Sequence, residues 1–264
     1  MFRQRLLTAL ILVPLVLIAI YYASYTVLST IILAIIALLG WEWLQLIPIK
    51  NNIGRCVYIA TLLLLVWPAT LWLNNWLIVD LIFWGLIFVA VVTFPASQAV
   101  WGHPAVVGSS CLLLLPVVAS SISALYQETN GKDYIVYLLC LIWAADIGAY
   151  LAGKQWGCHK LIPAVSPGKT IEGTIGGIGL VLIVATVGYL YFHPNNMLSW
   201  VVISLGTGLI SMLGDLFISM LKRRSNIKDT GRIFPGHGGV LDRLDSLIAA
   251  LPLFYFSRHF HAFF

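Results

Sequence analysis

Charged residues are the scarcest component of this 264-residue sequence. Lys, Arg, Asp and Glu make up 9% of it, apolar residues make up 60%, and the mean hydropathy is +0.95. Soluble domains are about 45–50% apolar and about 25% charged. The composition therefore excludes an ordinary water-soluble protein, and we expect no nucleic-acid partner. Lipid is the expected bulk solvent, which indicates an integral membrane protein.

Paired cysteines are also lacking. The four cysteines, Cys56, Cys111, Cys140 and Cys158, are scattered along the chain without a repeated spacing. This pattern argues against both a disulfide framework and a zinc site. We interpret the four as packing residues.

Long apolar runs are abundant. Windows of about 20 apolar residues predict an all-α, polytopic integral membrane protein with about nine transmembrane helices. The predicted spans are residues 6–24, 26–47, 56–73, 76–94, 105–125, 133–153, 173–193, 198–221 and 240–256. The first span resembles a signal peptide, but no small-residue cleavage site follows it and more spans do. We therefore expect it to be an uncleaved helix.

The lysines and arginines are distributed unequally between the two sides of these spans. Twelve of the 15 fall on one side, before the first span and after the second, sixth and eighth. Only Lys132 and Arg258 fall on the other side, and Arg243 lies at the start of the ninth span. This bias predicts a cytoplasmic amino terminus and two long cytoplasmic connections, at about 154–172 and 222–239.

Glu42 and Asp80 are the only acidic residues before Glu128. Glu42 lies between two tryptophans near the cytoplasmic end of the second span, so we expect an interfacial anchor with an exposed carboxylate. A functional role for this carboxylate is the alternative. Asp80 lies near the outer end of the fourth span, where its side chain is expected to reach the interface.

The stretch from 222 to 245 holds nine of the 25 charged residues. Asp242 and Asp245 lie there, and Asp146 and Asp215 lie in the sixth and eighth spans. An aspartate at a helix centre costs roughly 2.5–3.5 kcal/mol, so such carboxylates usually face a cavity, a partner or an ion. Each could pair with a nearby Lys or Arg to fix helix packing. Four of them beside two basic loops favour a shared site.

The two basic loops suit phosphate groups. Carboxylates at a wet membrane face are typical Mg²⁺ ligands, with phosphate and water completing the coordination. The glycines of GHGG at 236–239 allow backbone N–H groups to approach an anion. His237 is either a substrate contact or a surface histidine, whereas Arg224 and Arg232 are expected to face anionic headgroups.

The other loop contains SPGKTIEGTIGG at 166–177. A Walker A loop is excluded because Pro163 occupies the position of its first glycine. Ser166, Lys169 and Thr170 precede a predicted helix, an arrangement that favours an anion. The same letters are also an ordinary helix start.

The run SMLKRRSNIKDTGRIFPGHGGVLDRLD at 219–245 resembles the signature of phosphatidate cytidylyltransferases, the CDP-diacylglycerol synthases. In that signature a Ser is followed by Lys-Arg, Lys-Asp, His-Gly-Gly and Asp-Arg-x-Asp, and every position is filled here. DIGAY at 146–150 and SPGKTIEG at 166–173 resemble two further family motifs. The resemblance covers about 140–250, and the first half matches only as a set of apolar helices.

The resemblance implies transfer of CMP from CTP to phosphatidate, with Mg²⁺ required, a second cation allowed, and a homodimer. It implies these catalytic residues: Asp215, Asp242, Asp245, Lys169 and Arg243. It implies these metal ligands: Asp215, Asp242 and Asp146. It implies these substrate contacts: Ser166, Thr170, Lys222, Arg223, Lys228, His237, Gly238 and Gly239.

We treat 1–264 as a single membrane domain, with 1–130 as a helical scaffold and 131–256 as the catalytic part. The compact chain suggests a bacterial inner membrane.

Three other functions are alternatives for a membrane protein with intramembrane aspartates. A CTP-dependent lipid kinase would share the membrane architecture and move a different phosphate. A phosphatidyltransferase acting on CDP-lipids usually begins its acidic motif with Asp-Gly, and this pair is absent from the sequence. A transporter would carry charges in both halves of the chain, whereas here the first half is almost uncharged.

The distribution of basic residues makes a topological prediction. Nine spans place the amino terminus and the carboxyl terminus on opposite sides, with 222–239 in the cytoplasm. A reporter that is active only in the cytoplasm should therefore be inactive when fused after Phe264. Cytoplasmic activity of that fusion would contradict the nine-span topology.

Overall fold

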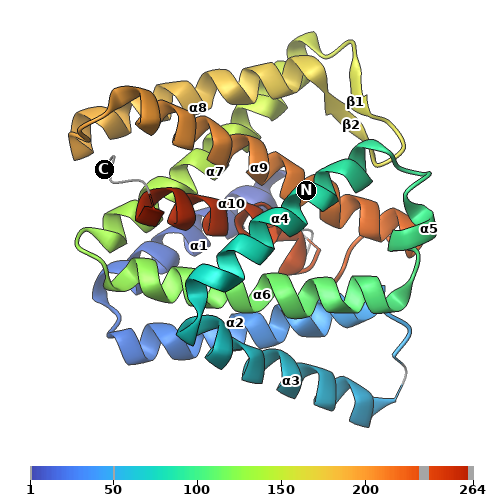
Figure 1. Cartoon of the computed structure of the whole chain (residues 1–264). Coiled ribbons are helices and arrows are strands. Elements are labelled where there is room, and N and C mark those ends of the chain that lie inside the picture. The colour runs from blue at the N-terminus through green and yellow to red at the C-terminus, as the bar shows by residue number, and fades with distance from the viewer. Residues whose placement is uncertain (1, 50, 232–237, 261–264) are drawn as a thin grey trace.

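The structure is a computed structural model that describes residues 2–49, 51–231 and 238–260, and these residues are almost wholly helical (Figure 1). The elements in chain order are α1 (Phe2–Tyr22), α2 (Tyr25–Trp43), the 3₁₀-helix η1 (Leu44–Leu46), α3 (Asn52–Leu71), α4 (Leu73–Val92), α5 (Gln98–Trp101), α6 (Pro104–Gln127), α7 (Gly131–Trp156), β1 (Lys160–Ile162), β2 (Ser166–Thr170), α8 (Ile171–Phe192), α9 (Met197–Arg224) and α10 (Leu241–Phe260).

The all-α prediction is confirmed, and each predicted span overlaps one long helix. Seven helices are long and apolar enough to cross a membrane within the described residues, namely α2 with η1, α3, α4, α6, α7, α8 and α9. The count of nine spans is not confirmed. The described apolar stretch of α1 is the short segment Leu12–Tyr22, and α10 contains two aspartates and two arginines.

The antiparallel hairpin of β1 and β2 was not predicted. It pairs Lys160 with Thr170 and Ile162 with Ser166. It lies in the connection between α7 and α8, at the edge of the helical body (Figure 1). The sequence predicts only a polar connection there, because strands of three and five residues give little periodic signal.

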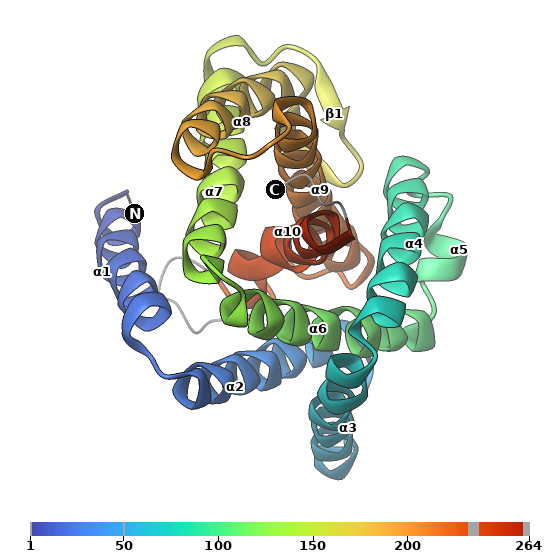
Figure 2. The ribbon, with the colours of Figure 1, turned by 60° about the vertical axis from the view of Figure 1, so that its left-hand side comes forward.

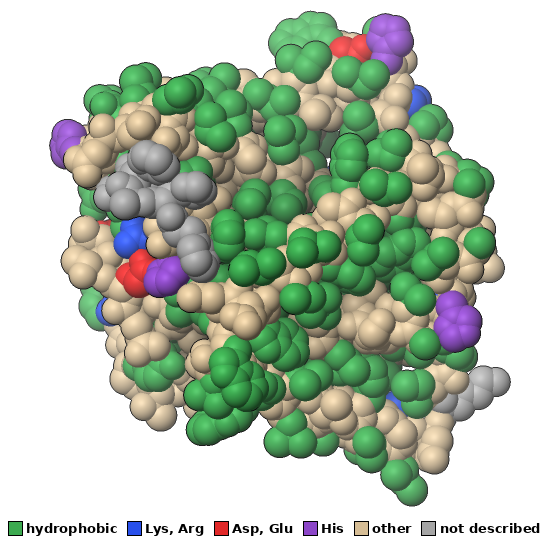
Figure 3. Space-filling model, in the orientation of Figure 1, with side chains coloured by type: hydrophobic (Ala, Val, Ile, Leu, Met, Phe, Trp, Pro, Cys, Tyr) green, Lys and Arg blue, Asp and Glu red, His purple; other side chains and the backbone are tan. Residues whose placement is uncertain are grey.

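The outer surface of the helices is apolar. On α3, Leu64 is 71% exposed and Trp67 is 72% exposed. Hydrophobic side chains cover much of the face drawn in Figure 3, and the few charged side chains lie towards its edges. Exposed apolar surface on helices of this length is expected where lipid is the solvent. The chain is therefore an integral membrane protein.

Small residues bring α7 and α8 close together. These two helices run side by side in both ribbon views (Figures 1 and 2). A Cβ atom added to Gly176 of α8 would lie 2.8 Å from the carbonyl oxygen of Gly148 on α7, and would also collide with the side chain of Ala152. Close backbone approach at small residues is typical of helix packing in membranes.

An aromatic cluster holds α9 against the first half of the chain. Phe217 is fully buried, and its ring centroid lies 5.3 Å from that of Trp101, 5.8 Å from that of Trp84 and 6.3 Å from that of Trp43. These tryptophans come from α5, α4 and α2. Trp43 also donates its indole N–H to the carbonyl oxygen of Val107 on α6, at 2.9 Å. The cluster fixes the part of α9 that carries Asp215.

The expectation for Asp80 was wrong. The side chain is fully buried in α4 and does not extend to the interface. A carboxyl group seven residues into a helix that packs against α6, α9 and α10 is enclosed by its neighbours. The distribution of charged residues could not reveal this burial. It predicts how deep a residue lies along a span, but not whether its side chain faces lipid or a neighbouring helix.

All four cysteines carry free thiols, which agrees with the absence of a disulfide framework. Cys111 is fully buried and packs in the core as predicted, whereas Cys56 and Cys158 are exposed. The packing interpretation therefore holds for Cys111 and is wrong for the two exposed thiols.

Two glycines of α8 form a matched test of the contact with α7. Gly176→Val should lower the thermal unfolding midpoint in detergent, because overpacking of a close contact typically costs 1–3 kcal/mol. Gly179→Val changes the same helix where no heavy atom lies within 4 Å of an added Cβ, so its midpoint should stay within about 1 °C of wild type. Equal midpoints for the two variants would contradict this packing.

Candidate active site

One face of α9 carries three polar side chains of the site. Asp215, Ser219 and Lys222 are spaced by four and three residues, which places them on the same side of a helix. Ser219 donates its hydroxyl to Asp215 Oδ1 at 3.3 Å. The helix continues to Arg224, three residues beyond the predicted end. Cations in the last turn of a helix are stabilised by its dipole, which explains the extension.

The hairpin brings Lys169 to this face. Its ammonium lies 2.8 Å from Asp215 Oδ2 and also donates to the carbonyl oxygen of Met212 at 3.3 Å. About a third of the Asp215 side chain is exposed. The unpredicted hairpin thus has a direct effect on the site, because β2 presents Lys169 to α9.

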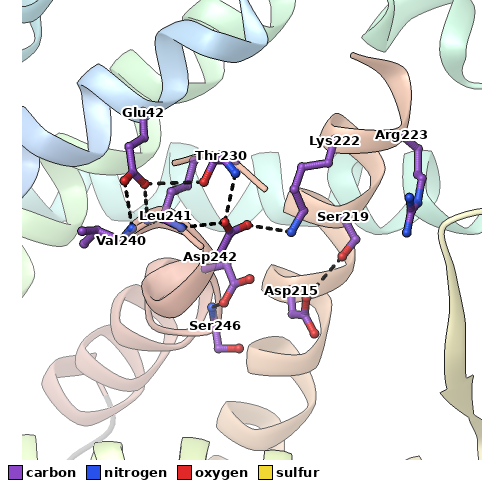
Figure 4. Close-up of polar contacts among 12 residues, drawn as sticks. Glu42, Asp215, Ser219, Lys222, Arg223, Thr230, Val240, Leu241, Asp242 and Ser246 are labelled. Atoms are coloured by element: carbon purple, nitrogen blue, oxygen red, sulfur yellow. Dashed lines mark hydrogen bonds and ion pairs between the residues drawn. The ribbon is translucent and has the colours of Figure 1, made fainter. Parts of the chain in front are cut away.

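Asp242 forms a second pair with Lys222, which lies nearly two turns after Asp215 on α9. Its Oδ1 lies 2.7 Å from Lys222 Nζ (Figure 4). Its Oδ2 accepts the backbone N–H groups of Thr230 and Gly239, each at 3.0 Å. Three donors therefore fix this carboxylate in the first turn of α10.

The remaining predicted carboxylates complete one electrostatic cluster. Asp146 on α7 interacts through charge with Asp215, Lys169 and Arg243. Asp245 is buried on α10, accepts the backbone N–H of Ser246 at 2.8 Å, and interacts through charge with Asp215, Lys222 and Lys169. Helices α7, α9 and α10 and the hairpin therefore meet where the sequence predicted a shared site.

A cavity of about 230 Å³ opens beside the first pair. Its polar lining includes Asp146, Lys169, Thr170 and Asp215, and Tyr150 and Leu161 contribute apolar surface. Asp242 and Lys222 lie outside this lining. The cavity thus combines two carboxylates, an ammonium group and an apolar wall. This lining suits an amphipathic ligand that has a charged group and an apolar part.

The predicted substrate contacts fall into two groups. Arg223 and Lys228 are exposed, and Arg223 donates its Nε–H to the carbonyl oxygen of Val165 at 3.3 Å. Thr170 is buried and its hydroxyl accepts the N–H of Gly173 at 3.1 Å, so this hydroxyl caps α8. The helix-start interpretation of Thr170 is confirmed.

Three further predicted contacts, Ser166, Gly238 and Gly239, lie at the ends of the basic loops. Ser166 begins β2 and is half-buried. Gly238 has φ +80°, which favours glycine, and the N–H of Gly239 points to Asp242. His237 and Arg232 lie outside the described residues.

Two expectations about polar residues of the first half and of α9 were wrong. Glu42 is 1% exposed and is not an interfacial anchor, since its carboxylate accepts the backbone N–H groups of Val240 and Leu241. Arg224 does not face headgroups, since it donates to the carbonyl oxygens of Leu46 at 2.8 Å and Gly102 at 2.6 Å. One signal was available for Glu42, because a carboxylate inside an apolar span usually has a specific partner.

The donor set fits Mg²⁺. Within the described parts of the chain, no group of three His, Cys, Asp or Glu side chains is close enough to enclose a metal. Mg²⁺ does not require such a cage, because it is usually held by one or two carboxylates with water and substrate phosphate. Asp146 and Asp215 supply hard oxygen donors at a cavity wall, as a metal shared between protein and substrate needs.

The fold and the site together define a polytopic membrane protein with a carboxylate and lysine site suited to phosphate chemistry. Comparison with known proteins agrees. The profile of the cytidylyltransferase family matches residues 3–261, so the chain belongs to the cytidylyltransferase family.

The phosphatidate cytidylyltransferase of Pseudomonas aeruginosa is 38% identical over 261 residues, covering 96% of each chain. That of Haemophilus influenzae is 34% identical over 293 residues, covering 98% of this chain and 99% of its own. That of Staphylococcus aureus strain COL is 46% identical over 146 residues, covering 54% of this chain and 56% of its own.

Proposed function

We propose that the chain transfers CMP from CTP to phosphatidate, giving CDP-diacylglycerol and pyrophosphate for phospholipid biosynthesis. Full-length similarity to phosphatidate cytidylyltransferases supports the substrates. The structural observation that supports the reaction most directly is the pair of aspartate–lysine contacts along α9, Asp215 with Lys169 and Asp242 with Lys222. Together they place two cations and two carboxylates along one face of α9, with Lys169 contributed by β2 and Asp242 by α10.

The proposed reaction forms a bond from a phosphate oxygen of the lipid to the α-phosphorus of CTP. The bond from that phosphorus to the β-phosphate oxygen breaks, and pyrophosphate leaves. The lipid phosphate is an oxyanion at neutral pH, so the step needs no strong general base. It needs in-line positioning and neutralisation of the charge on two polyanions.

The lysines supply that neutralisation in the proposed mechanism. Lys169 borders the cavity, and Lys222 lies seven residues after Asp215 on the same face of α9, paired with Asp242. Both ammonium groups are proposed to contact phosphate oxygens of the substrates. Arg223 and Lys228, which are exposed near the end of α9, add positive charge for the triphosphate. The apolar wall at Tyr150 and Leu161 suits the acyl part of the lipid.

Mg²⁺ would be held by Asp215 and Asp146, the two carboxylates of the cavity wall. Asp242 is the third proposed metal ligand; it lies outside that wall, beside Lys222, and would serve the second cation that the proposal allows. A bound Mg²⁺ would supply charge stabilisation at the α-phosphate and the leaving pyrophosphate. Asp245 and Arg243 are proposed to support these carboxylates, because both interact with the cluster through charge.

The setting of the enzyme is proposed from the sequence and its relatives. The excess of basic residues supports a cytoplasmic amino terminus and a cytoplasmic active site. The bacterial relatives support a bacterial inner membrane. A homodimer and a single membrane domain over 1–264 stay predictions.

Position-specific label tests the proposed reaction against a CTP-dependent lipid kinase. Purified protein with Mg²⁺, phosphatidate and α-³²P-CTP should yield labelled lipid, and γ-³²P-CTP should yield labelled pyrophosphate. The reason is that the nucleotide joins the lipid while the β- and γ-phosphates leave together. Label from the γ-phosphate in the lipid, with release of CDP, would instead establish a kinase.

Amide variants test the two aspartates of the paired contacts. Asp215→Asn and Asp242→Asn should each lower kcat at least a hundredfold at ordinary Mg²⁺, because the amide removes the charge that a cation requires. Asp133→Asn is the matched control, since Asp133 accepts a hydrogen bond from Tyr21 in the first turn of α7.

All three variants should insert and purify like wild type, and the control should keep its activity. Activity within threefold of wild type for either site variant would remove that aspartate from the proposed metal ligands. Equal losses in all three would indicate a general effect of the substitution on folding.

A further inference from the structure

Glu42 is a buried carboxylate that joins the first half of the chain to the start of α10. It lies next to the last residue of α2 and is 1% exposed. Its Oε1 accepts the N–H of Val240 at 3.0 Å and its Oε2 accepts the N–H of Leu241 at 2.7 Å. The hydroxyl of Thr230 lies 3.5 Å from Oε2 (Figure 4).

These contacts explain how a charge is tolerated inside the helical body. Burying an ionised carboxylate is costly unless it is paired or hydrogen-bonded. The partners of Glu42 among the described residues are backbone N–H groups and a hydroxyl. Val240 and Leu241 lie at the amino-terminal end of α10, where unsatisfied N–H groups and the helix dipole both favour an anion. Glu42 therefore caps α10 from another helix.

The segments that contact Glu42 are also the segments that hold Asp242. Thr230 gives its hydroxyl to Glu42 and its N–H to Asp242, and Gly239, whose N–H also goes to Asp242, directly precedes Val240. A Cβ atom at Gly231 or Gly239 would collide with the Glu42 carboxylate. The described segments 230–231 and 239–241 therefore enclose the Glu42 carboxylate, and the same segments donate two N–H groups to Asp242.

We infer that Glu42 is a positioning residue that sets the orientation of Asp242 for the cytidylyl transfer. The inference rests on the proposed function. Glu42 orders the backbone at 230 and 239–241, and two N–H groups of that backbone hold Asp242 Oδ2. Oδ1 is left to face Lys222. Through this backbone, Glu42 determines that Oδ1 and not Oδ2 of Asp242 faces cations.

A purely structural cap would have different consequences. It would stabilise the folded protein, and its loss would lower the unfolding midpoint while each folded molecule kept its turnover. A positioning residue also changes kcat in the folded protein, because misplaced reacting groups raise the barrier. The two roles are separated by measuring both quantities on the same variants.

Glu42→Gln is the informative substitution because the side chain keeps its shape. Its amide NH₂ group is a donor where a carboxylate oxygen accepted, so one backbone N–H loses its acceptor. Glu128→Gln is the matched control. Glu128 is paired with Arg258 at 2.6 Å near the opposite end of α10, far along the helix from Asp242.

Two kinds of measurement are made on purified proteins in detergent. Kinetics below the unfolding midpoint give kcat and the KM for CTP and for phosphatidate. Thermal unfolding gives the midpoint and its rise on adding Mg²⁺ with CTP. For Glu42→Gln we expect kcat at least tenfold lower, each KM within threefold of wild type, and a reduced rise. Glu128→Gln should keep wild-type kcat and a wild-type rise.

Glu42→Asp keeps the charge but shortens the side chain, so its kcat should lie between those of wild type and Glu42→Gln. If Glu42→Gln does not purify as a folded protein, Glu42→Asp decides, and a kcat within twofold of wild type overturns the inference. The inference is also overturned if the wild type is active and Glu42→Gln has the same kcat. A wild type that transfers no CMP would instead overturn the proposed function, and this inference with it.

Discussion

The ion pair of Lys222 and Asp242 is the contact on which the arrangement of the site depends. It joins the end of α9 to the start of α10 across an intervening loop. Asp242 uses its second oxygen to order that loop at two backbone N–H groups. Lys222 is in turn placed by α9, whose buried Phe217 is enclosed by three tryptophans of the first half. Apolar packing thus sets the position of a polar contact.

The first half of the chain is more than an apolar scaffold. It sends Glu42 to the backbone of the signature loop, and it receives Arg224 at the carbonyl oxygens of Leu46 and Gly102. Polar groups in an apolar setting must be satisfied by specific partners. A few such contacts therefore align two large helical segments more definitely than apolar packing alone, which tolerates small sliding movements.

The sequence was sufficient to predict the long helices and several polar residues that lie in contact in the structure, but not the connections between them. Hydropathy located the long helices because a lipid environment requires continuous apolar runs. The motifs identified Asp215 with Lys169 and Asp242 with Lys222, and the structure brings the two members of each pair into contact. The partners of Glu42 lie 198 and 199 residues away, and no local pattern encodes such a distance. The hairpin that presents Lys169 was missed because its strands are too short to show a period.

The geometry of α9 fixes the distance between Asp215 and Lys222. Seven residues of α-helix span about 10.5 Å and close nearly two full turns. The separation of the two backbone positions that carry the ionic contacts is therefore set by the helix and does not depend on side-chain rotamers. One residue inserted between them would rotate Lys222 by about 100° away from Asp242. An insertion in this interval would keep Lys222 on the side of Asp242 only if it added about a whole turn of helix.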